Sequence, residues 1–294
     1  MDFLQAFILG LVEGVTEYLP VSSTGHLIIA SSFLGLDEPK HKAAVDAFEI
    51  VIQGGAILAV LGLYWPRFVK MLRGLMGRDN AGFALLLNLG IAFAPSAALG
   101  LVLHKWINAH LFAPGPVVAA LVLGGVYMIL VDARRSGAWG NARLRPLAGS
   151  GKGIEDLTPG EALFIGVMQI FALWPGTSRS MMTITGGTMV GLRPAAAAEF
   201  SFLLGMPTLL AATVFTLVKD LLHARATGEP TFVAQLGMMP VLVGVAVAAV
   251  SAAIAVKWLV GFLNRHGLAA FGVYRIVLGV VLAGLIVGGV VRMG

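Results

Sequence analysis

Two similar stretches decide the fold of this chain: Glu13-Gly-Val-Thr-Glu17-Tyr-Leu-Pro20-Val-Ser22-Ser23-Thr24-Gly25-His26 and Gln169-Ile-Phe-Ala-Leu-Trp-Pro175-Gly176-Thr177-Ser178-Arg179-Ser180. Each places polar, hydroxyl and charged residues inside sequence that is otherwise apolar enough to lie in a lipid bilayer. Ionisable groups at membrane depth are costly and usually mark functional sites. Pro and Gly interrupt both stretches, so each is predicted to form the turn of a helix–loop–helix hairpin that is buried in protein.

The composition is that of a polytopic membrane protein. The 294 residues are 58% hydrophobic and 12% charged, whereas a soluble domain carries about 25% charged residues. The absence of cysteine excludes disulfides and thiolate chemistry. The net charge of +5 lies in loops, so no nucleic-acid partner is expected.

Six apolar runs are long enough to cross a bilayer, which takes about 20 residues: 44–64, 81–103, 117–131, 195–218, 237–259 and 271–291. Regions 3–36 and 161–190 contain the two polar stretches and are predicted to be re-entrant hairpins, each entering and leaving on one side. The expected fold is therefore all-α, with about six transmembrane helices and two re-entrant hairpins. If either hairpin spans the bilayer fully, the N-terminal topology changes.

Basic residues orient these spans. Two loops are rich in them, the first with Arg67, Lys70, Arg73 and Arg78 and the second with Arg134, Arg135, Arg143, Arg145 and Lys152. Both loops are predicted to be cytoplasmic by the positive-inside bias. The two termini would then face the periplasmic side.

The two halves resemble each other. Pro20-Val-Ser-Ser23 aligns with Pro175-Gly-Thr-Ser178, and Ala47-Phe48-Glu49 aligns with Glu199-Phe200-Ser201. We expect repeats over residues 1–145 and 146–294, each a hairpin plus three spans, within one integrated membrane domain. Three spans per repeat invert one copy relative to the other, an architecture of transporters that bind substrate at the repeat interface. The two polar loops are therefore predicted to meet near the middle of the protein.

Glu13 and Glu17 are four residues apart and so lie on one helix face. Their carboxylates are predicted to bind a divalent cation through oxygen ligands. Alternatively, one acts as a base while the other holds the metal. A structural alternative is a buried acid pair that neighbouring Ser and Thr residues satisfy.

Ser22, Ser23 and Thr24 precede a helix that is predicted to begin near His26. N-capping is the expected role of Ser22 and Thr24. Ser23 lies within one turn of His26 and close to the acidic pair, which suggests an activated nucleophile.

Arg179 has no acidic neighbour in the sequence. A guanidinium beside the free N–H groups of a helix start forms an anion site, and phosphate is its natural occupant. Alternatively, Arg179 pairs with Glu13 or Glu17 across the repeat. The candidate phosphate-binding residues are Thr24, Gly176, Thr177, Ser178, Arg179, Ser180 and Thr183.

Glu49 and Gln53 share one face of a third helix. Two roles are open for Glu49: it either caps that helix start or extends the acidic cluster.

These residues resemble the undecaprenyl-diphosphate phosphatase family, whose members confer bacitracin resistance. The stretch from Glu13 to Leu27 is similar to the acidic motif of that family. The stretch from Pro175 to Thr183 is similar to its Pro-Gly-x-Ser-Arg-Ser motif, and Phe48-Glu49-Ile-Val-Ile-Gln53 also matches. The resemblance extends from the first residues to the last span.

The resemblance implies hydrolysis of a C55 polyprenyl diphosphate to the monophosphate carrier that peptidoglycan synthesis reuses. It implies Mg²⁺ or Ca²⁺ as cofactor and a location in the bacterial inner membrane, with a site that opens toward the periplasm. By motif, the candidate catalytic residues are Glu17, Ser23, His26 and Arg179. Glu13 and Glu17 are the candidate metal ligands, and Ser22, Glu49 and Gln53 are supporting residues.

Rival functions remain open at this point. Inverted repeats around a polar centre also describe a lipid or ion transporter, and a flippase for the product lipid or a lipid-binding scaffold are further alternatives. The combination of an acid pair, Ser, His and Arg favours the enzyme, because a carrier of a neutral solute does not need it. Whether the protein forms a homodimer is left open.

Overall fold

The computed structural model describes residues 1–136 and 151–291. Its regular elements in this part of the chain are helices, which confirms the all-α prediction. In chain order they are α1 (Phe3–Thr16), α2 (Ser23–Phe33), α3 (Pro39–Leu63), α4 (Trp65–Leu75), α5 (Asn80–His110), α6 (Pro114–Ser136), η2 (Ile154–Asp156), α7 (Pro159–Ile170), η3 (Phe171–Leu173), α8 (Arg179–Met189), α9 (Pro194–Thr227), α10 (Phe232–Leu236), α11 (Met238–Leu263) and α12 (Ala269–Val287).

Six of the described helices are long and apolar enough to cross a membrane, as predicted. They are Lys42–Leu63, Asn80–Ile107, Pro114–Arg134, Pro194–Thr227, Met238–Leu263 and Ala269–Val287. Some helices run past the apolar runs seen in the sequence. Helix α9 continues to Thr227 and ends where Gly228 takes a left-handed conformation with φ of 76°, a common helix terminator.

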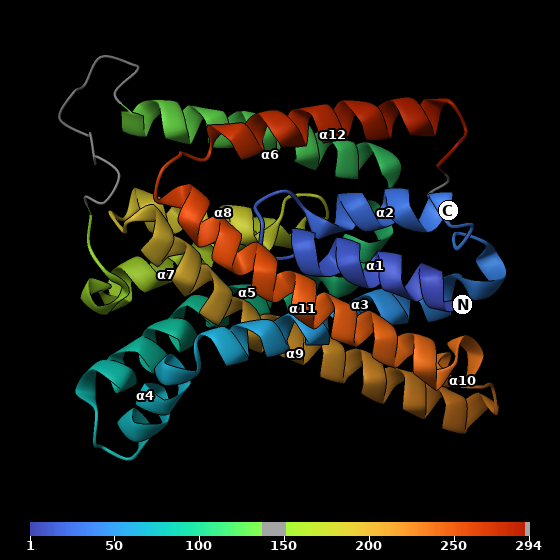
Figure 1. The fold of residues 1–294 in the computed structure, drawn as a ribbon, viewed down its shortest axis with the longest axis horizontal. Helices are drawn as coiled ribbons and strands as arrows, with labels where there is room; N and C mark the ends of the chain where they lie inside the picture. Colours follow the sequence, from blue (N-terminus) through green and yellow to red (C-terminus); the bar gives the residue numbers. More distant parts are fainter. Residues whose placement is uncertain (137–150, 292–294) are drawn as a thin grey trace.

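The remaining apolar helices form two hairpins. Helix α1 has 14 residues and α7 has 12, fewer than the roughly 20 that a span needs. Helices α1 and α2 open toward the end of the molecule at which both chain termini lie (Figure 1). Helices α7 and α8 open toward the opposite end (Figure 1). The turns of the two hairpins consequently meet in the interior.

Close backbone contacts fix the hairpins to long helices. A Cβ atom added to Gly10 of α1 would overlap the carbonyl oxygen of Gly244 in α11, and one added to Gly166 of α7 would overlap that of Ala92 in α5. Small residues at such crossings let helices approach closely in membranes, where no hydrophobic effect drives association. Helices α6 and α12 lie side by side in Figure 1.

The two hairpins have matching local geometry. Ser22 and Ser178 are the only described non-glycine residues with positive φ, at 72° and 76°. Each directly precedes an 11-residue helix, α2 or α8. Gly35 and Gly191, with φ of 67° and 93°, follow these helices. The correspondence is what a duplication of the hairpin would produce.

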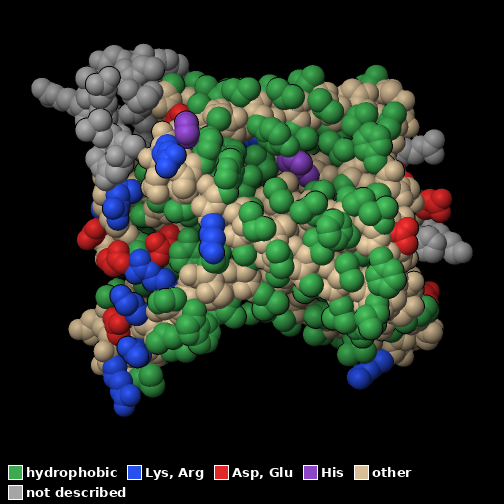
Figure 2. All heavy atoms as spheres, in the orientation of Figure 1, with side chains coloured by type: hydrophobic (Ala, Val, Ile, Leu, Met, Phe, Trp, Pro, Cys, Tyr) green, Lys and Arg blue, Asp and Glu red, His purple; other side chains and the backbone are tan. Residues whose placement is uncertain are grey.

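Charged side chains gather at the end of the molecule that carries α4, while hydrophobic side chains cover the middle (Figure 2). At this end Arg67 forms ion pairs with Glu155 and with Glu199, the latter at 2.6 Å. Arg143 and Arg145 lie outside the described residues, as does the side chain of Arg135. The distribution leaves an apolar belt of the kind that a bilayer surrounds.

Candidate functional site

Glu17 connects the two polar loops. Its Oε2 accepts a hydrogen bond of 2.8 Å from Ser23 Oγ at the start of α2. Its Oε1 lies 3.1 Å from Arg179 Nη2 at the start of α8, and the two side chains are only 8% and 10% exposed. The carboxylate of Glu17 therefore contacts both the first residue of α2 and the first residue of α8. The alternative that Arg179 pairs across the halves is confirmed for Glu17.

The guanidinium of Arg179 is held from several sides. Nη1 donates to the carbonyl of Ser201 in α9 at 2.8 Å, and Cζ lies 5.7 Å from the centre of the Tyr18 ring. A Cβ atom on Gly205 would fall 2.5 Å from Cζ, so a larger residue at this position would displace the guanidinium. Nε is buried and has no hydrogen-bond partner.

Glu13 is completely buried one turn before Glu17. Neither of its carboxylate oxygens has a hydrogen-bond partner, so the alternative in which Ser and Thr neighbours satisfy Glu13 is wrong. Burying an unpaired carboxylate is costly, and a bound cation would remove that cost. This donor set suits a divalent cation.

The described residues contain no group of three or more His, Cys, Asp and Glu side chains that could hold a metal ion. Glu13 and Glu17 therefore supply at most two carboxylates. Such a site suits Mg²⁺, which commonly binds through one or two carboxylates, retained waters and substrate phosphates.

Ser22 and Thr24 do not cap α2, contrary to expectation. Helix α2 begins at Ser23, so Thr24 already lies inside its first turn, and Ser22 at the N-cap makes no side-chain hydrogen bond to the helix. The Ser22 hydroxyl is buried without a partner.

The ring nitrogens of His26 bond to groups other than the Ser23 hydroxyl. Its Nδ1 lies 2.7 Å from the carbonyl oxygen of Ser22, and its Nε2 lies 2.7 Å from the Tyr274 hydroxyl. Because a carbonyl only accepts, Nδ1 carries the hydrogen, and Nε2 of the neutral ring accepts from Tyr274. The predicted neighbour of Ser23 is therefore engaged elsewhere, and Ser23 is bonded to Glu17.

Hydroxyls of the second stretch tie the two loops together. Ser180 Oγ donates to the Leu19 carbonyl at 2.8 Å, and the Thr183 and Ser201 hydroxyls lie 2.6 Å apart. Ser178 caps α8 by accepting a hydrogen bond from the Met181 N–H. These bonds place Arg179 at the free N–H end of α8.

The rest of the second stretch shapes the turn before α8. Gly176 has φ of 93°, and the Thr177 N–H donates to the Trp174 carbonyl at 3.1 Å. The Thr177 side chain is buried. The turn therefore presents main-chain groups next to Arg179.

Glu49 contacts α2 and also lies close enough to Glu13 for their charges to interact, so the alternative that it extends the acidic cluster is the one supported. Helix α3 begins at Pro39, so the predicted capping of a helix start by Glu49 is wrong. Its Oε1 accepts a hydrogen bond of 2.5 Å from Ser31 in α2. Gln53 lies one turn further along α3. Glu49 thus links α3 to α2 through the Ser31 side chain.

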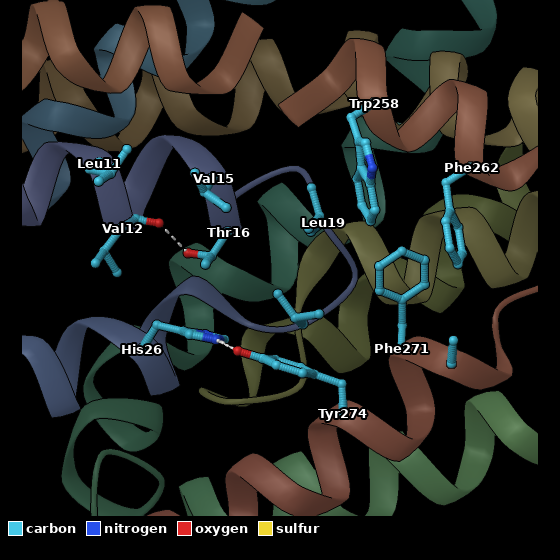
Figure 3. Close-up of a pocket in the computed structure, with 12 residues that line it drawn as sticks. Leu11, Val12, Val15, Thr16, Leu19, His26, Trp258, Phe262, Phe271 and Tyr274 are labelled. Atoms are coloured by element: carbon cyan, nitrogen blue, oxygen red, sulfur yellow. Dashed lines mark hydrogen bonds between the residues drawn. The ribbon is translucent and has the colours of Figure 1, made fainter. Parts of the chain in front are cut away.

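An apolar cavity of about 550 Å³ lies between the first hairpin and helices α11 and α12. In Figure 3 the His26 and Tyr274 side chains meet at one wall, facing Val15, Leu19 and the aromatic rings of α11 and α12. Its lining is Leu11, Val12, Val15, Thr16, Leu19, Val21, His26, Trp258, Phe262, Ala270, Phe271 and Tyr274. A cavity of this chemistry fits a hydrocarbon chain.

Sequence reasoning missed Gly205, Tyr274 and Arg275. Arg275 is an ionisable residue inside the predicted span 271–291, and that position alone was a usable signal. Gly205 carried no signal, because glycine is common in membrane helices.

Comparisons with known proteins agree with the motifs. The model of the family described as "Bacitracin resistance protein BacA" matches residues 6–281. A protein of Sorangium cellulosum named undecaprenyl-diphosphatase is 47% identical over 279 residues, which cover 95% of this chain and 85% of that protein. A protein of Deinococcus radiodurans with the same name is 40% identical over 295 residues, which cover 100% of this chain and 99% of that protein. Undecaprenyl-diphosphatase 2 of Rhodospirillum rubrum is 45% identical over 280 residues, covering 95% and 93%.

Proposed function

The chain belongs to the bacitracin resistance protein BacA family, and we propose that it is an integral membrane phosphatase. It hydrolyses undecaprenyl diphosphate to undecaprenyl phosphate and inorganic phosphate, which returns the carrier lipid to cell-wall synthesis and confers bacitracin resistance. The observation that carries this proposal is the Ser23–Glu17–Arg179 chain of contacts. It lies in a protein that also offers an apolar cavity next to the same hairpin.

Arg179 binds the diphosphate. A guanidinium matches phosphate oxygens with several N–H donors, and Nε of Arg179 has no hydrogen-bond partner among the described protein groups. The N–H groups at the start of α8 add a second anion-binding feature. The prenyl chain lies along the apolar cavity that His26 and Tyr274 border.

Ser23 is the favoured nucleophile. Its hydroxyl already donates to Glu17, the arrangement of a nucleophile beside its base. Arg179 is paired with Glu17; when phosphate competes for Arg179, Glu17 becomes free to take the Ser23 proton. The oxygen of Ser23 then bonds to the terminal phosphorus while the bond to the bridging oxygen breaks. Undecaprenyl phosphate leaves, and water hydrolyses the phosphoserine.

A divalent cation, Mg²⁺ or Ca²⁺, fits beside Glu13, with Glu17 as the second protein ligand. When bound, it would offset the negative charge that the diphosphate brings to the site. The unpaired, buried carboxylate of Glu13 supports this assignment.

The protein resides in the bacterial inner membrane, with its α4 end in the cytoplasm. Lys70, Arg73 and Arg78 at that end support this orientation through the positive-inside bias. The first hairpin then opens toward the periplasm, and the halves 1–145 and 146–294 are inverted copies.

The decisive experiment measures phosphate release from a polyprenyl diphosphate by the purified protein. Release should stop in EDTA and return with Mg²⁺ or Ca²⁺, and Ser23→Ala should be nearly inactive while Ser23→Thr keeps some rate. Recovery of intact diphosphate lipid would overturn the enzyme and favour a carrier. Full release in EDTA would remove the metal alone, and an active Ser23→Ala protein would remove only the assignment of the nucleophile.

A further inference from the structure

Arg275 in α12 is the largest side chain that the described part of the protein buries completely. Its Nη2 donates to the carbonyl of Ala120 in α6 at 3.0 Å and to that of Gly176 at 2.8 Å. Nε and Nη1 have no hydrogen-bond partner. None of the ion pairs among the described residues includes Arg275. An unneutralised guanidinium in this environment is costly, which indicates a functional reason for it.

Gly124 creates the space for this guanidinium, and Gly176 lets its loop approach α6 closely. A Cβ atom on Gly124 of α6 would fall 2.5 Å from Arg275 Nη2. Gly176 has φ of 93°, and its own Cβ would fall 2.7 Å from the Val117 carbonyl oxygen. Helix α6, the loop before Arg179 and the arginine of α12 therefore fit together as one unit.

The preceding residue, Tyr274, contacts the other hairpin. Its hydroxyl lies 2.7 Å from His26 Nε2, and the two rings are nearly parallel, with 7° between their planes. Figure 3 shows this pair reaching across between α2 and α12. Two consecutive residues of α12 thus contact both polar loops: Arg275 bonds to the Gly176 carbonyl, and Tyr274 bonds to the His26 imidazole.

We infer that Tyr274 and Arg275 are positioning residues for the phosphatase site, which rests on the function proposed above. Arg275 fixes the Gly176 carbonyl and thereby the loop that places Arg179 against Glu17. Tyr274 holds the ring of His26 at the wall of the apolar cavity. Neither residue contacts the phosphates; each acts through the residue that it holds.

The first test compares kcat and KM of Arg275→Lys with wild type. Lysine keeps the charge but lacks the longer, planar guanidinium whose Nη2 donates to both carbonyls. We expect kcat/KM to fall by about tenfold or more, since small misplacements of positioned groups reduce rates strongly. Val277→Ala, at an exposed position of the same helix, is the matched control and should equal wild type.

A double-mutant cycle shows whether Arg275 acts through Arg179. In an Arg179→Lys background, Arg275→Lys should cause less than about a twofold further loss, because residues in one network are not additive. Tyr274→Phe should behave in the same way in a His26→Gln background. Where residual turnover is too low to measure, the same double-mutant cycles can be built from the affinity for inorganic pyrophosphate, measured by calorimetry.

The outcomes separate this inference from the proposed function. A wild-type protein that releases no phosphate overturns the proposed function. An active wild type with unchanged kcat/KM in Arg275→Lys, or with multiplicative losses in the cycles, overturns the positioning role. If Arg275→Lys does not fold, Gly124→Ala, which displaces the guanidinium without removing it, must show the loss.

Discussion

Gly205→Ala tests the position of the Arg179 guanidinium without changing any polar group. The added Cβ would fall 2.5 Å from Cζ and 2.6 Å from Nη2 of Arg179, whereas ordinary contact begins at 3.4 Å. Helix backbone cannot retreat easily, so the arginine must move. A displacement of about 1 Å can cost 10²-fold in rate, which corresponds to roughly 2.7 kcal/mol of transition-state stabilisation.

The same change should leave the protein folded. Gly205 lies inside α9, where alanine is favoured over glycine by up to about 1 kcal/mol, which partly offsets the weaker contacts of Arg179. Gly90→Ala in α5 is the matched control, because a Cβ at Gly90 meets no atom within 4 Å.

The assay is phosphate release from a polyprenyl diphosphate, measured with thermal unfolding of the same preparations. We expect Gly205→Ala to lose about 10²-fold in kcat/KM at nearly wild-type stability, and Gly90→Ala to match wild type. Wild-type kcat/KM in Gly205→Ala would refute the argument that the site depends on where this guanidinium lies.

Three further predictions follow from the geometry. Arg179→Lys keeps the charge but loses the planar fork, so most phosphate release should be lost; wild-type turnover would reduce Arg179 to an ion-pair partner. Ser22→Gly removes the strain of a φ of 72° and should raise the free energy of unfolding by about 1 kcal/mol, which an unchanged unfolding midpoint would contradict. In this cysteine-free chain, Met76→Cys should react with membrane-impermeant thiol reagents only from the cytoplasm and Ala226→Cys only from outside. Labelling of both from one side would rule out the inverted arrangement.

The pairing of Glu17 with Arg179 could be anticipated from sequence because opposite charges at membrane depth have few other partners. Two matching motifs, one in each half, made their meeting the simplest arrangement. The six spans followed from apolar length alone. Sequence patterns of this kind depend on hydrophobicity and charge, and both can be read from the residue types alone.

The orientation of His26 could not be anticipated in this way. Spacing of three residues from Ser23 predicts a shared helical turn, but Nδ1 lies 2.7 Å from the backbone carbonyl oxygen of Ser22 and bonds to it in place of the Ser23 hydroxyl. Its second partner, Tyr274, is 248 residues distant in sequence. Gly205 is similar, since its importance depends on an arginine from another helix.

The backbone contacts that seat the hairpins have a genetic consequence. A side chain at Gly10 would overlap Gly244, and one at Gly166 would overlap Ala92, although none of these residues contributes a group to the proposed chemistry. In a saturation screen, inactivating substitutions should therefore occur at the small residues of these two helix crossings as well as in the polar loops. Many of the alleles so recovered would fail because a hairpin could not dock, with every reactive side chain still present.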